Sequence, residues 1–172
     1  MSLKKYDDKI REYRLRRKST IVTTRFNEKT YLENKEYRLS MNPIPACIYT
    51  SSHPVAVNVP LDKEIFVLEM NNEANRIMGI GRIFNIPIYN MHKIHDDKKF
   101  NFFSYIGTSR IDRIEMDKME DDIMKVFDTL CFKGKRNLKR LKKRFPIDML
   151  YNCKEILDIV VFVSDMFKKR YS

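Results

Sequence analysis

The strongest constraint on the fold is a pair of apolar segments separated by the five residues NNEAN (71–75). The segments EIFVLEM (64–70) and RIMGIGRIF (76–84) are rich in residues that favour strands, and NNEAN is rich in residues that favour turns. Two strand-like runs joined by a short connection of this kind are typical of a β-hairpin. We therefore expect the fold to be built around a sheet that contains this hairpin.

Other strands are expected on both sides of the hairpin. The segment 30–41 fits either a helix or a strand, and the four prolines of 43–60 exclude a helix and indicate extended chain broken by turns. The remaining segments with strand-like composition are 20–26, 86–94, 100–107 and 109–116.

Helices are expected in the last third of the chain. Residues 116–132 carry acids in the first turns, where they suit the helix dipole, and apolar residues at helical spacing. The predicted apolar stripe comprises Met119, Ile123, Val126, Phe127 and Leu130. A closing helix is predicted within 147–172, with an apolar face formed by Ile156, Ile159, Val160, Val163 and Phe167.

This order predicts an α+β protein with a curled antiparallel sheet or small barrel, flanked by helices and ending in a C-terminal helix. The length of 172 residues fits one domain. We expect a basic N-terminal arm or helix at 1–19 and a β-rich domain at 20–132. The basic segment and the C-terminal helix at 133–172 are expected to pack on the same domain.

Positive charge is concentrated in two segments of a chain whose net charge is +11. Residues 133–144, KGKRNLKRLKKR, hold eight Lys or Arg and no acid, and residues 1–18 hold eight basic and three acidic residues. Concentrated positive charge is typical of proteins that bind a polyanion. A solvated basic face without a partner is the alternative interpretation.

Two of the four glycines lie close together, at Gly79 and Gly81. A phosphate-binding loop needs its glycines between a strand and a helix, whereas these lie within a strand pattern. Alternate residues of a strand share a face, so the two missing side chains predict a groove. The groove could reflect a bend or bulge of the sheet, or the close approach of a base or of another backbone.

Metal and catalytic motifs are weak. His92 and His95 are three residues apart and His53 is distant, which matches no common zinc spacing. The acids Asp62 and Glu64 match a nuclease motif only loosely, and no nucleophile motif is recognisable. We therefore predict a protein that is not an enzyme and that needs neither metal nor cofactor.

Aromatic and basic residues alternate between 89 and 113, which is the pattern of surfaces that stack bases and neutralise phosphates. The alternative is that most of these rings fill the core. The residues concerned are Tyr89, Phe100, Phe102, Phe103 and Tyr105, with Lys93, Lys98, Lys99, Arg110 and Arg113.

The sequence also predicts the compartment. No apolar run is long enough to span a membrane, and the first residues lack the apolar core of a secretory signal. Three widely spaced cysteines, Cys47, Cys131 and Cys153, indicate free thiols in a reducing environment. We expect an intracellular protein without a membrane partner.

The strand IMGIGRI, which follows a polar turn, resembles the EVE, ASCH and YTH domains of the PUA-like superfamily. The segments LEMNN, YIGTSRIDR and CFKGKRNLKR resemble basic proteins of large DNA viruses. The first resemblance implies a small PUA-like pseudo-barrel that binds RNA or a modified base in an aromatic-lined pocket. The second implies a location in the host cytoplasm or a viral factory, or packaging in the virion.

The chain lacks Trp, the usual cage residue of methyl-base readers, so the pocket would have to use other aromatic residues. Asn71 and Asn72 could contact a base edge or serve only as turn residues. Arg110, Asp112 and Arg113 could form a network at the rim or mere surface pairs. The pocket candidates are Tyr49, Asn71, Asn72, Gly79, Gly81, Tyr89, Tyr105, Arg110 and Arg113.

The sequence thus predicts a nucleic-acid-binding protein that prefers RNA to DNA, reads a base in the groove over Gly79 and Gly81, and could bind a protein partner through its N-terminal arm. The alternatives are a basic assembly protein of a virion or packaging complex and, third, a metal-dependent nuclease. The predicted phosphate-binding residues are Lys133, Lys135, Arg136, Lys139, Arg140, Lys142, Lys143 and Arg144.

Overall fold

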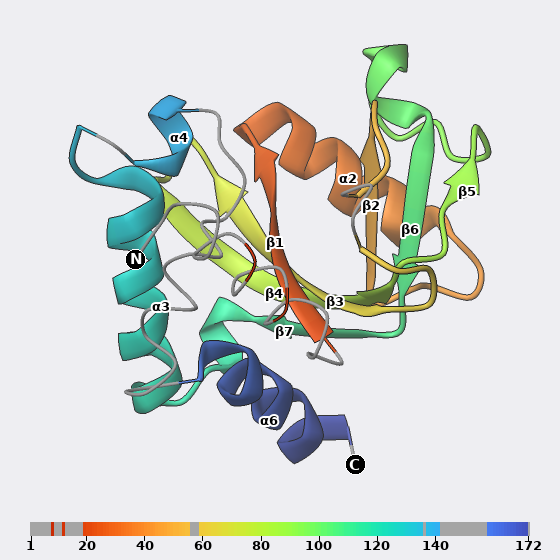
Figure 1. Ribbon diagram of the computed structural model, residues 1–172. Coiled ribbons are helices and arrows are strands. Elements are labelled where there is room, and N and C mark those ends of the chain that lie inside the picture. The colour runs from red at the N-terminus through yellow and green to blue at the C-terminus, as the bar shows by residue number, and fades with distance from the viewer. Residues whose placement is uncertain are drawn as a thin grey trace.

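The computed structural model of the chain describes residues 8, 12, 19–55, 59–135, 137–141 and 158–171. Almost all of the predicted N-terminal arm (1–19) lies outside these residues, as does the first part of the predicted closing helix. The described residues form an α+β fold with a four-stranded and a three-stranded sheet. In Figure 1, helices α3 and α6 lie on one side of the four-stranded sheet, and the three-stranded sheet and α2 lie on the other.

The four-stranded sheet has the order β1-β3-β4-β7. The predicted hairpin is confirmed, because β3 (Glu64–Asn71) and β4 (Arg76–Phe84) pair antiparallel, as do β4 and β7 (Ser109–Asp112). However, β1 (Ser19–Phe26) pairs with β3 in parallel. The sheet is therefore mixed rather than purely antiparallel.

The parallel pair depends on the ambiguous segment, which is a helix. Helix α2 (Glu28–Ser40) begins at a capping box in which Asn27 and Thr30 satisfy each other's backbone N–H groups. None of its residues is buried, so it lacks the apolar stripe that would have identified it. The helix forms part of the long connection that two parallel strands require.

The three-stranded sheet has the order β2-β6-β5 and is antiparallel. Its strands are β2 (Cys47–Ser51), β6 (Phe103–Gly107) and the short β5 (Ile88–Tyr89). The chain passes from β6 into β7 and so links the two sheets. Gly107 allows this passage, because a β-carbon there would overlap the carbonyl oxygen of Arg82. The described strands do not close into a barrel.

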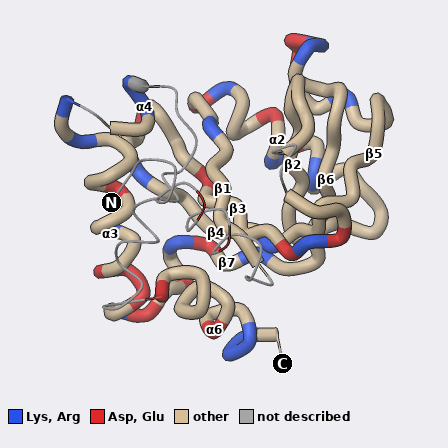
Figure 2. Tube along the Cα trace, viewed as in Figure 1, with Lys and Arg blue, Asp and Glu red and all other residues tan. Residues whose placement is uncertain are grey.

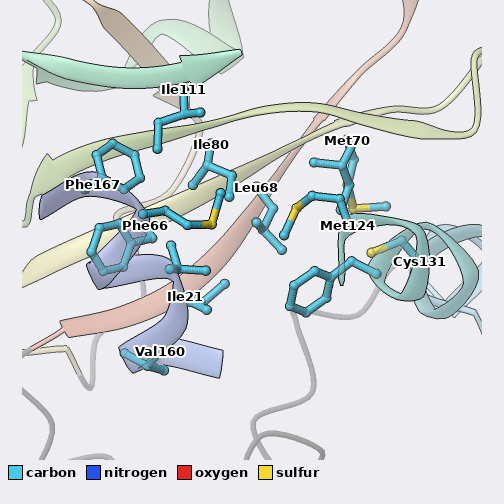
Figure 3. Close-up of a cluster of buried hydrophobic side chains, with 14 of the residues drawn as sticks. Ile21, Phe66, Leu68, Met70, Ile80, Ile111, Met124, Cys131, Val160 and Phe167 are labelled. Carbon is cyan, nitrogen blue, oxygen red and sulfur yellow. The ribbon is translucent and has the colours of Figure 1, made fainter. Parts of the chain in front are cut away.

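The larger core lies between the four-stranded sheet and the helices (Figure 3). Helix α6 (Ile159–Tyr171) buries Val160, Val163 and Phe167, as predicted, and Phe167 packs against Phe66 of β3 with ring centroids 5.2 Å apart. The short helix α4 (Leu138–Leu141) adds Leu138. Within the described ranges, no helix has the length and apolar character to cross a membrane.

Helix α3 (Lys118–Phe132) is present as predicted, but its buried stripe is shifted by about one residue. Met119 and Val126 are 64% and 56% exposed, whereas Met124, Phe127 and Cys131 are buried. The buried stripe also includes Glu120, whose carboxylate accepts hydrogen bonds from Arg170 of α6 at 2.6 and 2.9 Å. An acid at a core position looks like a surface residue in the sequence, and its partner lies fifty residues away.

A second core fills the space between the two sheets. It contains Phe26, Cys47, Tyr49, Ile65, Val67, Ile83 and Tyr105. Two 3-10 turns complete the described fold, η1 (Lys98–Asn101) before β6 and η2 (Arg113–Glu115) after β7.

Candidate nucleic-acid interface

Gly79 lies where the β3–β4 ladder is irregular, and Gly81 lies just beyond this place, where it pairs with Val67. Leu68 pairs with Ile80 but Met70 pairs with Ile77, so β4 has one residue more than β3 in this interval. This register shift is the bulge that the sequence allowed for. The polar groups of the Ile77 backbone are satisfied by side chains, because its N–H donates to Asp128 and its carbonyl accepts from Arg113.

Both glycines face the space between the sheets, and that space is filled. A β-carbon on Gly81 would overlap the hydroxyl of Tyr49, and one on Gly79 would lie 2.7 Å from Nη2 of Arg110. The prediction of a base-binding groove over these glycines is therefore wrong. Their missing side chains make room for protein side chains of β2 and β7.

Those side chains surround a buried acid, Glu69 of β3. Arg110 donates to both Glu69 carboxylate oxygens, with Nη2–Oε2 at 2.7 Å and Nε–Oε1 at 3.0 Å. The hydroxyl of Tyr49 donates to Oε1 at 2.7 Å, and Arg110 also donates to Asp112 at 2.9 Å. We call Tyr49, Glu69, Arg110 and Asp112 the inter-sheet polar cluster. Arg110 and Asp112 were expected either at the rim of a pocket or in surface pairs, and the cluster fits neither expectation.

The electrostatics of the inter-sheet polar cluster favour a neutral Tyr49 and a charged Arg110. Burial, together with the nearby Cys47 and Glu69, raises the pKa of Tyr49 well above its usual value. Burial alone would lower the pKa of Arg110, but the hydrogen bonds that it donates to Glu69 and Asp112 outweigh burial and raise the pKa. Burial raises the pKa of the Cys47 thiol to about 12. The Arg110 guanidinium is thus a charged partner for Glu69, and the Tyr49 phenol is a neutral donor to it.

Two further pocket candidates belong to a turn. Asn71 is buried, and its side-chain oxygen accepts from the backbone N–H groups of Glu73 and Ala74 at 3.0 Å. The backbone carbonyl of Asn72 accepts a hydrogen bond from Lys139. The turn interpretation is correct for Asn71, and Asn72 is the point where the hairpin meets the basic segment.

The other candidates do not converge on one place. Tyr105 is buried, and its hydroxyl accepts from the backbone N–H of Val55 at 2.9 Å. Arg113 is buried on the helix side, where it donates to Asp121 at 2.5 Å and to Asp128 at 3.1 Å. Only Tyr89 is exposed among the predicted pocket tyrosines.

The basic segment provides an accessible charged surface. Lys133, Lys135 and Arg140 are exposed, and none of them forms an ion pair with any residue that the structure describes. In Figure 2 basic positions lie at α4 and at the end of α3, away from the acids at the start of α3. The predicted residues Arg136, Lys142, Lys143 and Arg144 lie outside the described residues or have no described side chain.

Lys139 has a different role from its neighbours. Its ammonium group donates to the carbonyl of Asn72 at 2.5 Å and to Oδ1 of Asn75 at 2.7 Å. Arg25 of β1 donates to the carbonyl of Leu138 at 3.1 Å. These contacts attach α4 to the four-stranded sheet and thereby hold the basic segment in position.

Basic residues elsewhere on α3 are neutralised locally. Lys118 pairs with Asp122, and Lys125 pairs with both Asp121 and Asp122, each at 2.9 Å. Because the opposite charges lie so close together, their combined electrostatic field attracts a distant polyanion only weakly. The basic segment is therefore the stronger candidate for phosphate contacts.

Three of the side chains considered for chemistry, His92, His95 and Glu64, form contacts with neighbouring side chains. His92 accepts from or donates to the hydroxyl of Tyr37 at 3.0 Å, and His95 lies 2.7 Å from the carboxylate of Glu33. Glu64 is 3.9 Å from Arg82. In the part of the chain that the structure describes, no three His, Cys, Asp or Glu side chains are grouped to hold a metal ion.

Comparisons with family models, with curated proteins and with solved structures found no match for this chain.

Proposed function

We propose that this protein binds nucleic acid through the basic segment 133–144 and does not catalyse a reaction. The observation that carries the proposal is the exposure of Lys133, Lys135 and Arg140 without an acidic partner among the described residues. Cations left free in the folded protein can replace the counterions of a phosphate backbone, and the release of those counterions drives binding.

The attachment of α4 supports the proposal. Lys139 and Arg25 fix the segment to the sheet through hydrogen bonds to neutral oxygens. A fixed array of cations loses less conformational freedom on binding than a free tail would. The neighbouring cations are thus available for phosphate while the backbone of α4 is held.

The resemblances extend the proposal. The GIG strand resembles PUA-like domains, so we propose a PUA-like pseudo-barrel that prefers RNA to DNA. Phosphate contacts are common to both nucleic acids, and the preference therefore rests on the resemblance alone. The buried free thiols of Cys47 and Cys131 support an intracellular location. The resemblance to proteins of large DNA viruses supports a viral factory or virion.

Salt dependence tests the proposal. The affinity of the wild-type protein for a labelled RNA oligonucleotide is measured by fluorescence anisotropy at several salt concentrations. We expect the logarithm of the binding constant to fall with the logarithm of salt concentration, with a slope of several units. Replacing Lys133, Lys135 and Arg140 by Met should reduce the slope by about two units, from roughly 0.7 per single-strand phosphate contact.

A matched control replaces Lys118, Lys125 and Lys168 by Met, which removes the same charge from ion-paired positions. This control should keep most of the slope. An absence of binding, a flat salt dependence, or an equal effect of the two triple variants would refute the proposal. Equal affinity for RNA, DNA and heparin would instead favour the alternative of a basic assembly protein.

A further inference from the structure

A second accessible surface lies at the edge of the three-stranded sheet, which Figure 1 places on the other side of the molecule from α4. Tyr89, Met91 and Phe102 are 68%, 67% and 55% exposed, and Phe100 is exposed as well. We call this the β5–η1 surface and define it by Tyr89, Met91, Lys93, Lys98, Phe100 and Phe102. Large apolar side chains that gather at one exposed place usually mark a binding site.

Backbone contacts join the two segments that carry the β5–η1 surface. Tyr89 pairs with Phe103 in the β5–β6 ladder, and the N–H of Asn90 donates to the carbonyl of Phe102 at 2.9 Å. The rings of Tyr89 and Phe103 meet edge to face, with centroids 5.2 Å apart. Phe103 in turn packs on the core between the sheets. Tyr89 is therefore supported from beneath while most of its ring faces solvent.

The uncompensated charge of the surface is positive. The two nearby acids are neutralised, because Asp96 pairs with Lys29 at 2.6 Å and Asp97 pairs with Lys99 at 2.8 Å. Lys93 and Lys98 are exposed and pair with no acid in the described ranges. The surface thus combines exposed aromatic rings with free cations.

We infer that the β5–η1 surface stacks the bases of a single-stranded nucleic acid; this inference rests on the proposed function. An exposed ring can stack on the face of any base, and the adjacent lysines can neutralise the phosphates of the same strand. A duplex does not fit, because its base faces are covered by one another. An apolar protein partner fits less well, because its binding would bury Lys93 and Lys98 without counterions.

The absence of Trp from the chain provides a direct test. The variant Tyr89→Trp carries one indole at the proposed stacking position, and Ile114→Trp carries one at an exposed position on η2. We expect oligo(U) to quench the fluorescence of Tyr89→Trp at saturation and to leave that of Ile114→Trp unchanged. Heparin, which has charge but no bases, should quench neither variant.

Affinity gives the second readout. The double variant Tyr89→Ala/Phe102→Ala should bind oligo(U) about 5- to 100-fold more weakly, from the usual effect of removing base stacking. It should bind heparin as the wild type does. Met91→Ala, which removes exposed apolar area without a ring, should change oligo(U) binding less than twofold.

The inference is overturned if oligo(U) binds the wild type but neither quenches Tyr89→Trp nor loses affinity in the double variant. That result would leave the proposed function intact. It is also overturned if Met91→Ala is as harmful as the double variant, because the contact would then be apolar rather than aromatic. Failure of the proposed function is separately visible, since heparin and oligo(U) would then both fail to depend on Lys133, Lys135 and Arg140.

Discussion

The hydroxyl of Tyr49 occupies the space that a β-carbon on Gly81 would need. The strand β4 therefore has a glycine at this position because β2 of the other sheet brings a phenol against it. The hydroxyl is held there by its hydrogen bond to Glu69. The missing side chain of Gly81 is thus explained by packing between the sheets rather than by a ligand.

Substitution of Gly81 by Ala should destabilise the protein by about 2 kcal/mol or more, because the added methyl group forces Tyr49 out of a well-packed site. Urea denaturation followed by circular dichroism measures this loss. Gly134→Ala is the matched control, since Gly134 has a positive φ of 80° but no atom of the described residues in the way of a β-carbon. It should cost only about 1 kcal/mol, from the strain of a β-carbon at positive φ. Equal costs for the two substitutions would contradict the packing described for Gly81.

The ion pair between Glu69 and Arg110 should show strong coupling. Glu69→Leu or Arg110→Met alone leaves a buried charge without its partner, and each should cost about 3 kcal/mol. The double variant should be more stable than the sum of the single losses predicts. The same cycle on the exposed pair Lys118 and Asp122 should give a coupling below about 0.5 kcal/mol. Additive losses at Glu69 and Arg110 would show that the two residues do not act as a pair.

Substitutions of Lys139 and Lys135 should affect different properties, the first the stability of the fold and the second the binding of RNA. Lys139→Met removes the hydrogen bonds to Asn72 and Asn75 and should lower the free energy of unfolding by about 1 kcal/mol. Lys135→Met, at an exposed position without an acidic partner among the described residues, should leave stability unchanged and reduce the salt slope of RNA binding by about 0.7 units. Thermal unfolding and anisotropy titrations on both variants measure the two effects. Equal behaviour of the two variants would contradict the distinct role given to Lys139.

Acid should weaken the contact between η2 and α3. Hydrogen bonds from Arg113 and then Lys125 lower the pKa of Asp121 from the usual 3.8 to about 2. A carboxyl whose pKa is lower in the folded state contributes stability above its unfolded pKa, and the contribution is lost as the pH falls through the folded value. Stability should therefore decline between about pH 4 and pH 2, as measured by urea denaturation at successive pH values.

Asp121→Asn isolates this contribution. The variant should be less stable than the wild type at pH 7, by about 1 kcal/mol because the group is partly exposed, and should lose less stability between pH 4 and pH 2. Asp165→Asn, in an exposed pair with Lys168, should keep the wild-type pH profile. If Asp121→Asn declines as steeply as the wild type, the ion pair with Arg113 does not contribute as described.

Structural features that depend on residues close together in the sequence were predictable. The β3–β4 hairpin and helix α3 follow from apolar runs, turn residues and acids near the helix start. The stripe of α3 was displaced because Glu120 is buried against Arg170. The helix α2 had no apolar stripe to reveal it.

Only part of the candidate site was predictable from the sequence. The charge of the basic segment is visible in the sequence, and so is the space left by two glycines on one face of a strand. The occupant of that space is not visible, because Tyr49, Glu69 and Arg110 come from three strands in two sheets. One signal could have pointed to it: Glu69 interrupts the apolar run from Ile65 to Met70, and a buried acid requires a cation.

The parallel pairing of β1 with β3 has a consequence for the order of assembly. The β3–β4 hairpin closes over a short turn, whereas β1 must wait for a strand that begins at Glu64. During synthesis, β1 leaves the ribosome before its partner exists, and Ile21 and Phe26 remain in contact with water until β3 emerges. Non-local strand pairing of this kind forms slowly. We therefore expect β1, although it is made before β3, to be among the last strands to join the sheet.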